Sequence, residues 1–284
     1  MNLLYDILLQ KQDFSPTEAM IADQILQYGD SILDLSIQEL AKATHTSTTT
    51  IMRFCKKVNR SGFKEFKHKF AQALSLERLK DGEIDDENYP FTAHDAECDI
   101  IDKIAQLTKY TINACQMMLD PKLIHRVVHE MIQAKSILAI GVSDSFLRLV
   151  DFQNKMLKIN YYIKMSYLQP EQTFLCTHAT QNDFALIVSF SGKTAEIVNE
   201  AKILRKRGVN AIALTANPSS PLAQLARTVI LLPSKSNETT LPYCFSSQIA
   251  IEYVLNVIYS AVYRLNFEKN RRYMYKTKNM YLHK

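Results

Sequence analysis

Ser189-Phe190-Ser191-Gly192-Lys193-Thr194 is the stretch that decides the fold of this chain. The apolar run 184–188 before it is typical of a buried strand, and residues 195–207 after it have the periodicity of a helix. The first N–H groups of a helix lack internal partners and attract anions, so such a loop can hold a phosphate. Glycine allows the backbone to approach closely, and the hydroxyls and the lysine are donors. The predicted phosphate-binding residues are Ser189, Ser191, Gly192, Lys193 and Thr194.

A second strand-to-helix loop favours a binding site over the simpler interpretation, in which Ser191 only caps a helix. Residues 135–140 have the pattern of a strand, and a helix is expected over about 146–159. The loop between them contains Ser143 and Ser145. Ligands of open α/β sheets bind at the carboxyl ends of the strands, where the strand order reverses. We therefore expect these two hydroxyls to lie opposite the loop 189–194.

The alternation of apolar runs with helical patterns predicts the architecture of the larger part of the chain. Helices are expected over 98–119 and 121–134 and, at the end, over about 244–265. The predicted strands are 137–140, 161–165, 184–189, 211–215 and 229–232. Strands that alternate with helices form a parallel sheet with right-handed crossovers. The fold class is therefore a doubly wound α/β domain with a parallel, five-stranded sheet.

The first part of the chain is predicted to be all-α. Capping boxes begin at Ser15 and Ser36, each with a glutamate three residues later. The turn Thr44-His45-Thr46 separates a short helix from a second helix, 48–58, that Ser47 caps, and a further helix is expected over 63–76. Two helices joined by a three-residue turn are typical of a helix-turn-helix.

The second helix of this pair has the residues that a DNA-reading helix needs. Threonine hydroxyls and methyl groups suit base edges, and arginine and lysine suit phosphates or guanine. Between residues 53 and 69 there are seven Lys or Arg and one Glu, a local charge of +6 against +5 for the whole chain. The alternative is a small helical dimerisation or protein-binding domain with solvated lysines, but the turn spacing, the cap and the charge together favour DNA binding. The predicted DNA-binding residues are Ser47, Thr48, Thr49, Thr50, Arg53, Lys56, Lys57, Lys64 and Lys67.

The stretch 134–233 resembles a sugar isomerase (SIS) domain. Ser189, Ser191, Gly192 and Thr194 match the second loop of that family, Ser-x-Ser-Gly-x-Thr. Thr215 and the stretch Ser220-Pro221-Leu222-Ala223 match a later element of its pattern. The first loop departs from the family, because Ser143 stands where a second glycine is usual. The resemblance implies that the ligand is a phosphosugar.

The first part resembles the helix-turn-helix of the RpiR family of bacterial regulators, in which an SIS domain follows. The resemblance rests on 39–41, Ser47, 50–51, 53–55 and 61–66. The chain departs from the family at the turn, where His45 replaces a glycine, although histidine tolerates positive φ better than most residues. The resemblance implies a transcriptional regulator that binds an operator in duplex DNA and responds to a phosphorylated sugar.

The predicted organisation is a helix-turn-helix domain at 1–78, an acidic linker at 79–97, an SIS domain at 98–265 and a basic tail at 266–284. The linker contains an acidic run at 81–87 and a proline. The tail has seven basic residues from position 264 onward and one acid, Glu268. It could contact DNA or a partner subunit, or be a frayed, solvated extension.

Composition and residue spacing exclude several other classes. The five cysteines have no CxxC spacing, which favours a reducing compartment and argues against a cysteine metal site. His125 and His129 have helical spacing, but no third ligand completes a metal site. We expect no cofactor, no membrane association, a cytoplasmic location and a homodimer or homotetramer. Glu196 leaves open an aldose–ketose isomerase with a helical extension, although we expect no catalytic residues.

Overall fold

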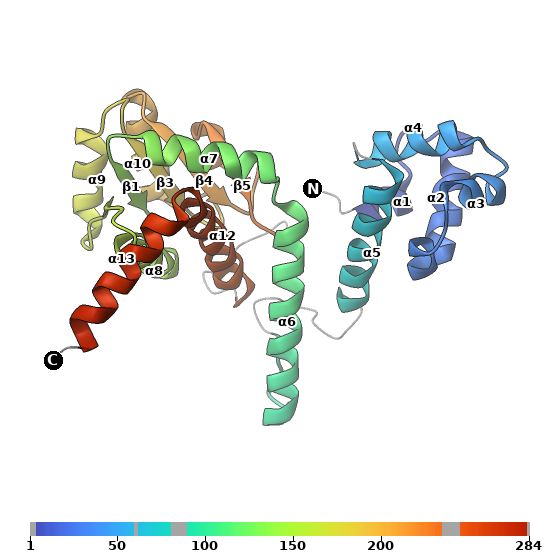
Figure 1. The fold of residues 1–284 in the computed structure, drawn as a ribbon, viewed down its shortest axis with the longest axis horizontal. Helices are drawn as coiled ribbons and strands as arrows, with labels where there is room; N and C mark the ends of the chain where they lie inside the picture. Colours follow the sequence, from blue (N-terminus) through green and yellow to red (C-terminus); the bar gives the residue numbers. More distant parts are fainter. Residues whose placement is uncertain (1–3, 60–61, 81–89, 235–244, 283–284) are drawn as a thin grey trace. The chain divides into compact units, whose positions relative to one another are not determined.

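The computed structural model describes residues 4–59, 62–80, 90–234 and 245–282 (Figure 1). The chain divides into two compact units, residues 1–85 and 86–284. The acidic run at 81–87 lies outside the described residues.

The first unit is a bundle of helices. Its elements are α1 (Leu4–Gln10), α2 (Pro16–Tyr28), the 3-10 helix η1 (Gly29–Leu33), α3 (Ile37–Ala43), α4 (Thr48–Asn59) and α5 (Phe63–Lys80). The two capping boxes are confirmed, at the starts of α2 and α3. Stacked and edge-to-face rings of Phe54, Phe66 and Phe70 form the centre of the core. The sequence analysis missed α1 and η1, and α5 extends to Lys80 rather than to position 76.

The turn between α3 and α4 is built as a helix-turn-helix requires. Thr44 is buried, and its hydroxyl donates to the carbonyl of Leu40 at 2.8 Å. The N–H of Thr46 donates to the carbonyl of Ala41 at 2.9 Å, which closes the end of α3. His45 has φ 47°, so histidine does adopt the left-handed conformation that the glycine of the family would supply.

The second unit is a parallel α/β domain. After α6 (Glu97–Met118) and α7 (Pro121–Gln133), strands and helices alternate: β1 (Ile137–Ile140), α8 (Ser143–Lys158), β2 (Ile163–Lys164), α9 (Gln169–His178), β3 (Phe184–Val188), α10 (Ala195–Lys206), β4 (Asn210–Thr215), α11 (Pro221–Leu225), β5 (Thr228–Leu231), α12 (Phe245–Leu265) and α13 (Phe267–Leu282). The strand order is β2-β1-β3-β4-β5, and all four pairings are parallel. The predicted five-stranded parallel sheet is confirmed.

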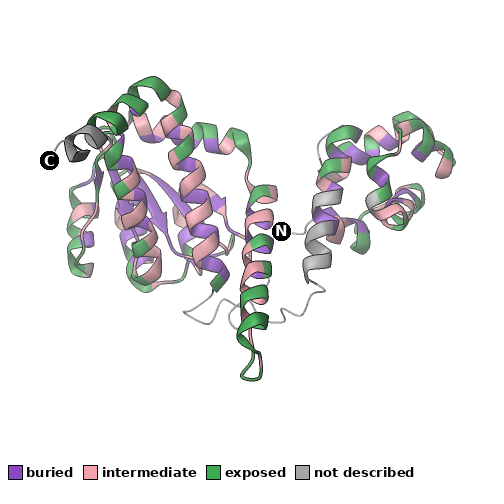
Figure 2. Cartoon of the chain, turned by 60° about the horizontal axis from the view of Figure 1, so that its bottom comes forward, coloured by how far each residue is buried: buried purple, intermediate pink, exposed green. Residues whose placement is uncertain are grey.

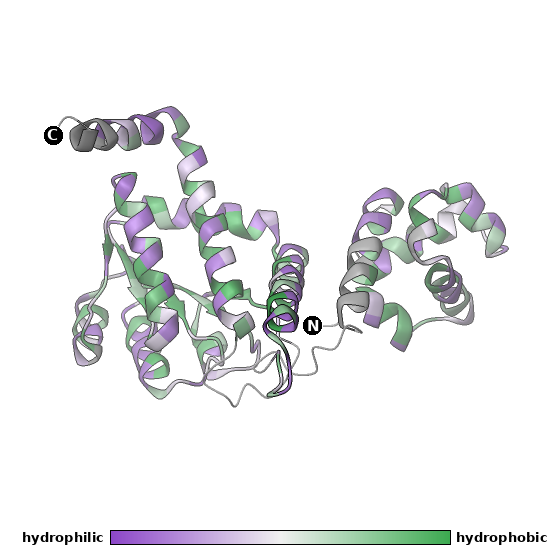
Figure 3. Ribbon diagram, turned by 90° about the horizontal axis from the view of Figure 1, so that it is seen from below, coloured by the Kyte–Doolittle hydropathy of each residue, from purple (hydrophilic) through white to green (hydrophobic). Residues whose placement is uncertain are grey.

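Both faces of the sheet are covered, as Figure 2 shows by the burial of its strands. Alternate strand residues enter two separate apolar cores. Phe184, Leu186 and Val188 pack with α7, α8 and α12, whereas Ala185 and Ile187 pack with α9, α10 and α11. Colouring by hydropathy shows the apolar strands between helices of mixed polarity (Figure 3). This two-sided burial explains why the strands are continuous apolar runs.

Several predicted boundaries change. The second strand is only Ile163–Lys164, and α8 begins at Ser143 rather than near position 146. The helix α9 was not predicted. The tail forms the helix α13 over Phe267–Leu282, which corrects the alternative of a frayed extension. In α13 the buried Asn270 donates from Nδ2 to the carbonyl of Tyr263 at 2.9 Å, so this side chain joins it to α12.

Among the described residues, no helix is both long and apolar enough to cross a membrane.

Candidate functional site

The strand order brings the two predicted loops together. The chain runs from β1 outward to β2 and then returns to β3 on the other side of β1. Because β1 and β3 are parallel neighbours, with Ile140 opposite Ile187, their carboxyl ends lie side by side. Gly141 and Val142 follow β1 and lead to Ser143 and Ser145 at the start of α8, and the loop 189–194 follows β3. The two loops therefore flank the switch point of the sheet, where ligands of this fold class bind.

The loop after β3 is a tight turn around Gly192. This glycine has φ 66°, and its N–H donates to the carbonyl and to the hydroxyl of Ser189, at 3.0 and 3.2 Å. The Ser189 and Thr194 hydroxyls are 3.1 Å apart and hydrogen-bonded across the loop. Ser191 lies partly exposed between them, and Lys193 is exposed. The turn thus gathers hydroxyls before the first residue of α10.

The alternative role of Ser191, as the cap of α10, does not fit the structure. Thr194 is the N-cap residue, and within the described part of the chain no side-chain hydrogen bond caps this helix. The Ser191 hydroxyl accepts the N–H of Lys193 at 3.2 Å, within the loop itself. Because the hydroxyl of Ser191 is the acceptor in this bond, its own proton remains available for donation to a ligand.

The segment that follows β4 supports this turn. Thr215, fully buried, donates from Oγ1 to the carbonyl of Phe190 at 3.1 Å, and Leu222 donates its N–H to the carbonyl of Gly192 at 3.2 Å. A Cβ atom on Gly192 would lie 2.2 Å from the hydroxyl oxygen of Ser220. Thr215 and Leu222 therefore hold the loop by hydrogen bonds, and Ser220 packs closely against Gly192.

The loop after β1 is held by a residue that the sequence analysis missed. Gln172 of α9 is buried, accepts the N–H of Gly141 at 3.2 Å and donates to the carbonyl of Gly141 at 3.0 Å. Ser143 is exposed and has φ 52°, so it adopts the backbone conformation of the glycine that it replaces. Ser143 and Ser145 lie in the first turn of α8 rather than ahead of it.

Two carboxylates of the second unit, those of Glu200 and Asp183, have shifted pKa values. Burial raises the pKa of Glu200 on α10 to about 7, and the charge of Glu196 adds to the effect. Glu196 itself is exposed in the first turn of α10. The pKa of Asp183 is lowered: burial opposes the shift, but hydrogen bonds from Ser136 and from the backbone and hydroxyl of Thr180 outweigh it.

The predicted DNA-binding residues lie on α4 and α5. Ser47 caps α4 by accepting the N–H of Thr50 at 3.1 Å, and its hydroxyl also bonds that of Thr50. Ser47 and Lys57 are exposed but hydrogen-bonded, whereas no hydrogen bond within the described residues holds the other exposed side chains, Thr48, Thr49, Arg53, Lys56 and Lys64. These five residues therefore form the free part of the predicted surface.

Two of the predicted lysines have internal partners instead. Lys57 donates to the carboxylate of Glu18 and to the carbonyl of Asp13, at 2.8 and 2.7 Å. Lys67 donates to the carbonyls of Leu33 and Leu35, both at 2.7 Å. These bonds join α4 and α5 to the rest of the first unit, which gives both lysines a structural role.

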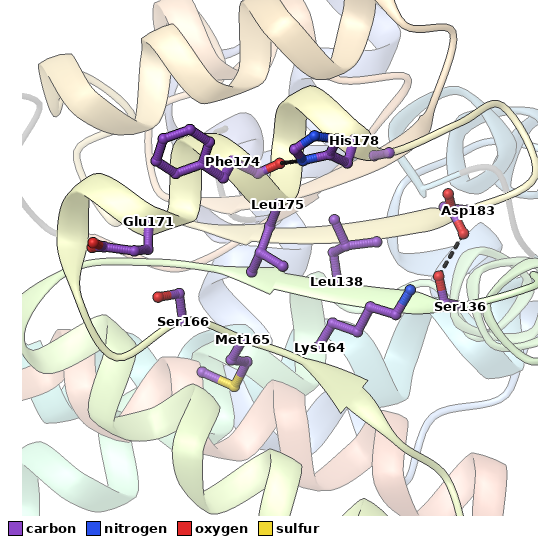
Figure 4. A pocket seen from close by; sticks show the side chains of 11 residues that line it. Ser136, Leu138, Lys164, Met165, Ser166, Glu171, Phe174, Leu175, His178 and Asp183 are labelled. Carbon is purple, nitrogen blue, oxygen red and sulfur yellow. Dashed lines mark hydrogen bonds between the residues drawn. The ribbon is translucent and has the colours of Figure 1, made fainter.

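A separate cavity of about 370 Å³ lies beside the edge strand β2 (Figure 4). Leu138 and Leu175 form its apolar floor, and the amine of Lys164 lies across it toward Asp183. His178 binds the carbonyl of Phe174 through Nδ1 at 2.8 Å. Because this cavity combines acidic and basic groups, its lining does not select one charge of ligand.

Comparison with known proteins assigns both units to families. Residues 1–77 match the family model described as a helix-turn-helix domain of the rpiR family, and residues 130–256 match the SIS domain. HexR from Pseudomonas aeruginosa, an HTH-type transcriptional regulator, is 28% identical over 264 residues, which cover 92% of this chain and 89% of HexR. RpiR from Escherichia coli, also named a transcriptional regulator, is 24% identical over 273 residues, which cover 95% of this chain and 88% of RpiR.

A solved structure has the same fold along the whole chain. The Vibrio vulnificus NanR protein, complexed with ManNAc-6P, aligns with a TM-score of 0.59 and 22% identity, covering 99% of this chain and 98% of NanR. A helix-turn-helix unit joined to a parallel α/β domain defines a two-domain, DNA-binding transcriptional regulator. The chain belongs to the RpiR family of regulators with an SIS domain. Its relatives are named as regulators, which does not support the isomerase alternative.

Proposed function

We propose that this regulator binds a phosphorylated sugar at the switch point of its SIS domain and that the sugar alters its binding to an operator. The proposal rests on the neighbouring carboxyl ends of β1 and β3, one of which leads to the hydroxyls in the first turn of α8 and the other to the hydroxyls of the loop 189–194. The phosphate would be held by Ser189, Ser191, Gly192, Lys193 and Thr194, with Ser143 and Ser145 opposite. The complex of the NanR relative with ManNAc-6P supports this class of ligand.

The proposed mechanism needs no cofactor and no catalytic residue. Ligand phosphate bridges the two loops, and the arrangement of paired SIS domains shifts with it. The regulator acts as a homodimer or homotetramer, since helix-turn-helix proteins read paired half-sites. Its place is the cytoplasm, where a bacterial regulator meets its operator. The sugar can change DNA binding only by binding the two arrangements with different affinity.

Calorimetry with phosphosugars chosen from a thermal-shift panel tests the site. Ser191→Ala is expected to weaken binding roughly tenfold or more, because a hydrogen bond to a charged group contributes about 1.5–3 kcal/mol. The unphosphorylated sugar should bind far more weakly than its phosphate. Thr177→Ala is the control, since that exposed hydroxyl bonds only within α9. Equal affinity for the sugar and its phosphate would show that the loop is not a phosphate site.

The DNA surface is tested by salt titration of operator binding. Arg53→Ala and Lys56→Ala should weaken binding and reduce its dependence on salt, because each lost phosphate contact releases about one counterion fewer. Lys57→Ala is the matched comparison from the same helix. Since Lys57 binds Glu18 and Asp13, its loss should lower the melting temperature more than it changes the salt dependence. An unchanged salt dependence in the Arg53 and Lys56 variants would contradict the assignment.

A further inference from the structure

A second concave site lies in the SIS domain between α7 and α12, and it shares no residue with the loops at the switch point. Its volume is about 300 Å³. Ile124 and Val128 line it from α7, and Tyr253, Val257 and Ala261 line it from α12. Their four-residue spacing puts one stripe of each helix in the wall. Leu119 at the end of α6 and Leu265 at the end of α12 complete the apolar lining.

The walls are only partly covered by the protein itself. Tyr253, Val257 and Ala261 are half-buried and pack against the core behind them. A cavity of this size with apolar walls and a few polar groups is typical of small-molecule sites.

The polar groups that border this cavity are positively charged or neutral. They are Arg264 of α12, the imidazoles of His125 and His129 of α7, whose ring centres are 4.3 Å apart, and the amide of Gln116. Among the described residues, no carboxylate forms an ion pair with Arg264 or with either imidazole, whereas Arg148 and Arg271 have acidic partners. Asp120, adjacent to the lining residue Pro121, accepts the N–H of Lys122 as the cap of α7. The cavity thus combines apolar walls with cationic and donor groups.

We propose that this cavity binds a small, soluble organic anion with an apolar body, such as a medium-chain or aromatic carboxylate. The apolar body would lie between Val128, which is buried, and the half-buried Val257, where it would remove the exposed part of the α12 wall from water. The head group would bind Arg264, whose guanidinium can hold a carboxylate or sulfonate with two parallel hydrogen bonds. Such a site would give the regulator a second effector input, separate from the loops.

The full-length protein and two probes test the proposal: anilinonaphthalene sulfonate, followed by its fluorescence, and decanoate as its competitor. We expect saturable binding of the sulfonate that decanoate displaces and decanol displaces poorly. Arg264→Gln should weaken binding of both anions roughly tenfold, because a charge-assisted hydrogen bond is lost. Lys269→Gln is the control, since that lysine is exposed on α13 and does not line the cavity.

Two variants fill the cavity in order to separate binding there from binding elsewhere. Val257→Phe and Ala261→Leu enlarge side chains of the α12 wall and should abolish probe binding while the phosphosugar response is kept. Circular dichroism identifies a variant that has not folded, and the other variant then decides. Unchanged probe affinity in both filled variants, or in Arg264→Gln, overturns the proposal. So does binding to anionic phospholipid vesicles without binding of soluble decanoate, and so does a filled variant that changes only the oligomeric state.

Discussion

At the scale of single residues, the backbone of both candidate sites depends on positive φ angles. Gly192 has φ 66°, and Ser143 and His45 reach 52° and 47° without being glycine. A left-handed conformation costs a residue with a Cβ atom about 1–2 kcal/mol. Since Ser143 and His45 stand where the family has glycine, this chain keeps the family's backbone geometry at the expense of some strain. Gly192 differs from them, because the surrounding atoms leave no room for a Cβ.

Alanine substitutions at Gly192 and at Gly208 test whether the surroundings of Gly192 leave no room for a Cβ atom. Gly192→Ala should lower the melting temperature and remove phosphosugar binding, because its Cβ would meet Ser220 at 2.2 Å and Thr215 at 2.8 Å. Gly208→Ala has a similar φ, 72°, but its Cβ would meet only Gln181 at 3.8 Å. It should therefore show the conformational cost alone, about 1–2 kcal/mol, with ligand affinity unchanged. The measurements are thermal unfolding and calorimetry, and equal effects of the two substitutions would contradict the crowding at Gly192.

The members of the candidate loops could be predicted from the sequence, whereas their supports could not. Hydroxyls, a glycine and a lysine between a strand and a helix are a local pattern. Gln172 holds Gly141 from 31 positions away. Nothing in the sequence around a helical glutamine predicts a hydrogen bond to such a distant residue. The partners of Lys57 and Lys67, 39 and 32 positions away, were hidden for the same reason.

At the scale of elements, strong periodicity predicted the elements that the core buries. The strands β1, β3, β4 and β5 were predicted to within one residue at each end, because each contains an apolar run, and in β1 and β3 every residue is buried. The strand β2 is shorter than predicted: Lys164 is exposed, so only Ile163 is buried in it. The helix α9 escaped prediction because its amphipathic pattern is weak. One polar residue of α9, Gln172, is nevertheless buried and hydrogen-bonded to the loop that follows β1.

Helix α10 contains an ionisable group that links stability to pH. Glu200 is buried, its Oε2 has no hydrogen-bond partner among the residues that the structure describes, and it lies near Cys176 of α9 and Glu196 of its own helix. Burial raises its pKa from 4.5 to about 7. The folded state therefore holds this proton more tightly than the unfolded state. The stability contributed by the protonated form is present below about pH 4.5 and is lost as the pH rises to about 7.

Glu200→Gln should remove this dependence. At about pH 8 the variant is expected to be more stable than the wild type by roughly 1–3 kcal/mol, whereas near pH 5 the two should differ much less. Glu196→Gln is the comparison, because it removes the neighbouring charge but leaves Glu200 buried, so only a small part of the pH dependence should disappear. Denaturant unfolding at the two pH values measures both. A wild type whose stability does not fall between them would show that Glu200 is not protonated in the folded state.

At the scale of the whole molecule, regulation requires that ligand binding to one unit change the affinity with which the other unit binds its own ligand. The helix-turn-helix unit and the SIS domain are separate compact units of the chain. A coupling of about 1–3 kcal/mol would change operator affinity about 5–150-fold when the sugar binds. Linkage then requires that operator DNA change the affinity for the sugar by the same factor.

This reciprocity gives the last prediction, measured on the full-length protein with an operator fragment selected by its own binding. The change in operator affinity on adding a phosphosugar should equal the change in phosphosugar affinity on adding the operator. Ser191→Ala should leave operator binding without sugar unchanged, because Ser191 lies in the other unit, and should shift the sugar response to higher sugar concentration. Fluorescence anisotropy of labelled DNA and calorimetry of the sugar give the two factors. If both ligands bind but each leaves the affinity of the other unchanged, the SIS domain does not control the DNA-binding unit through this site.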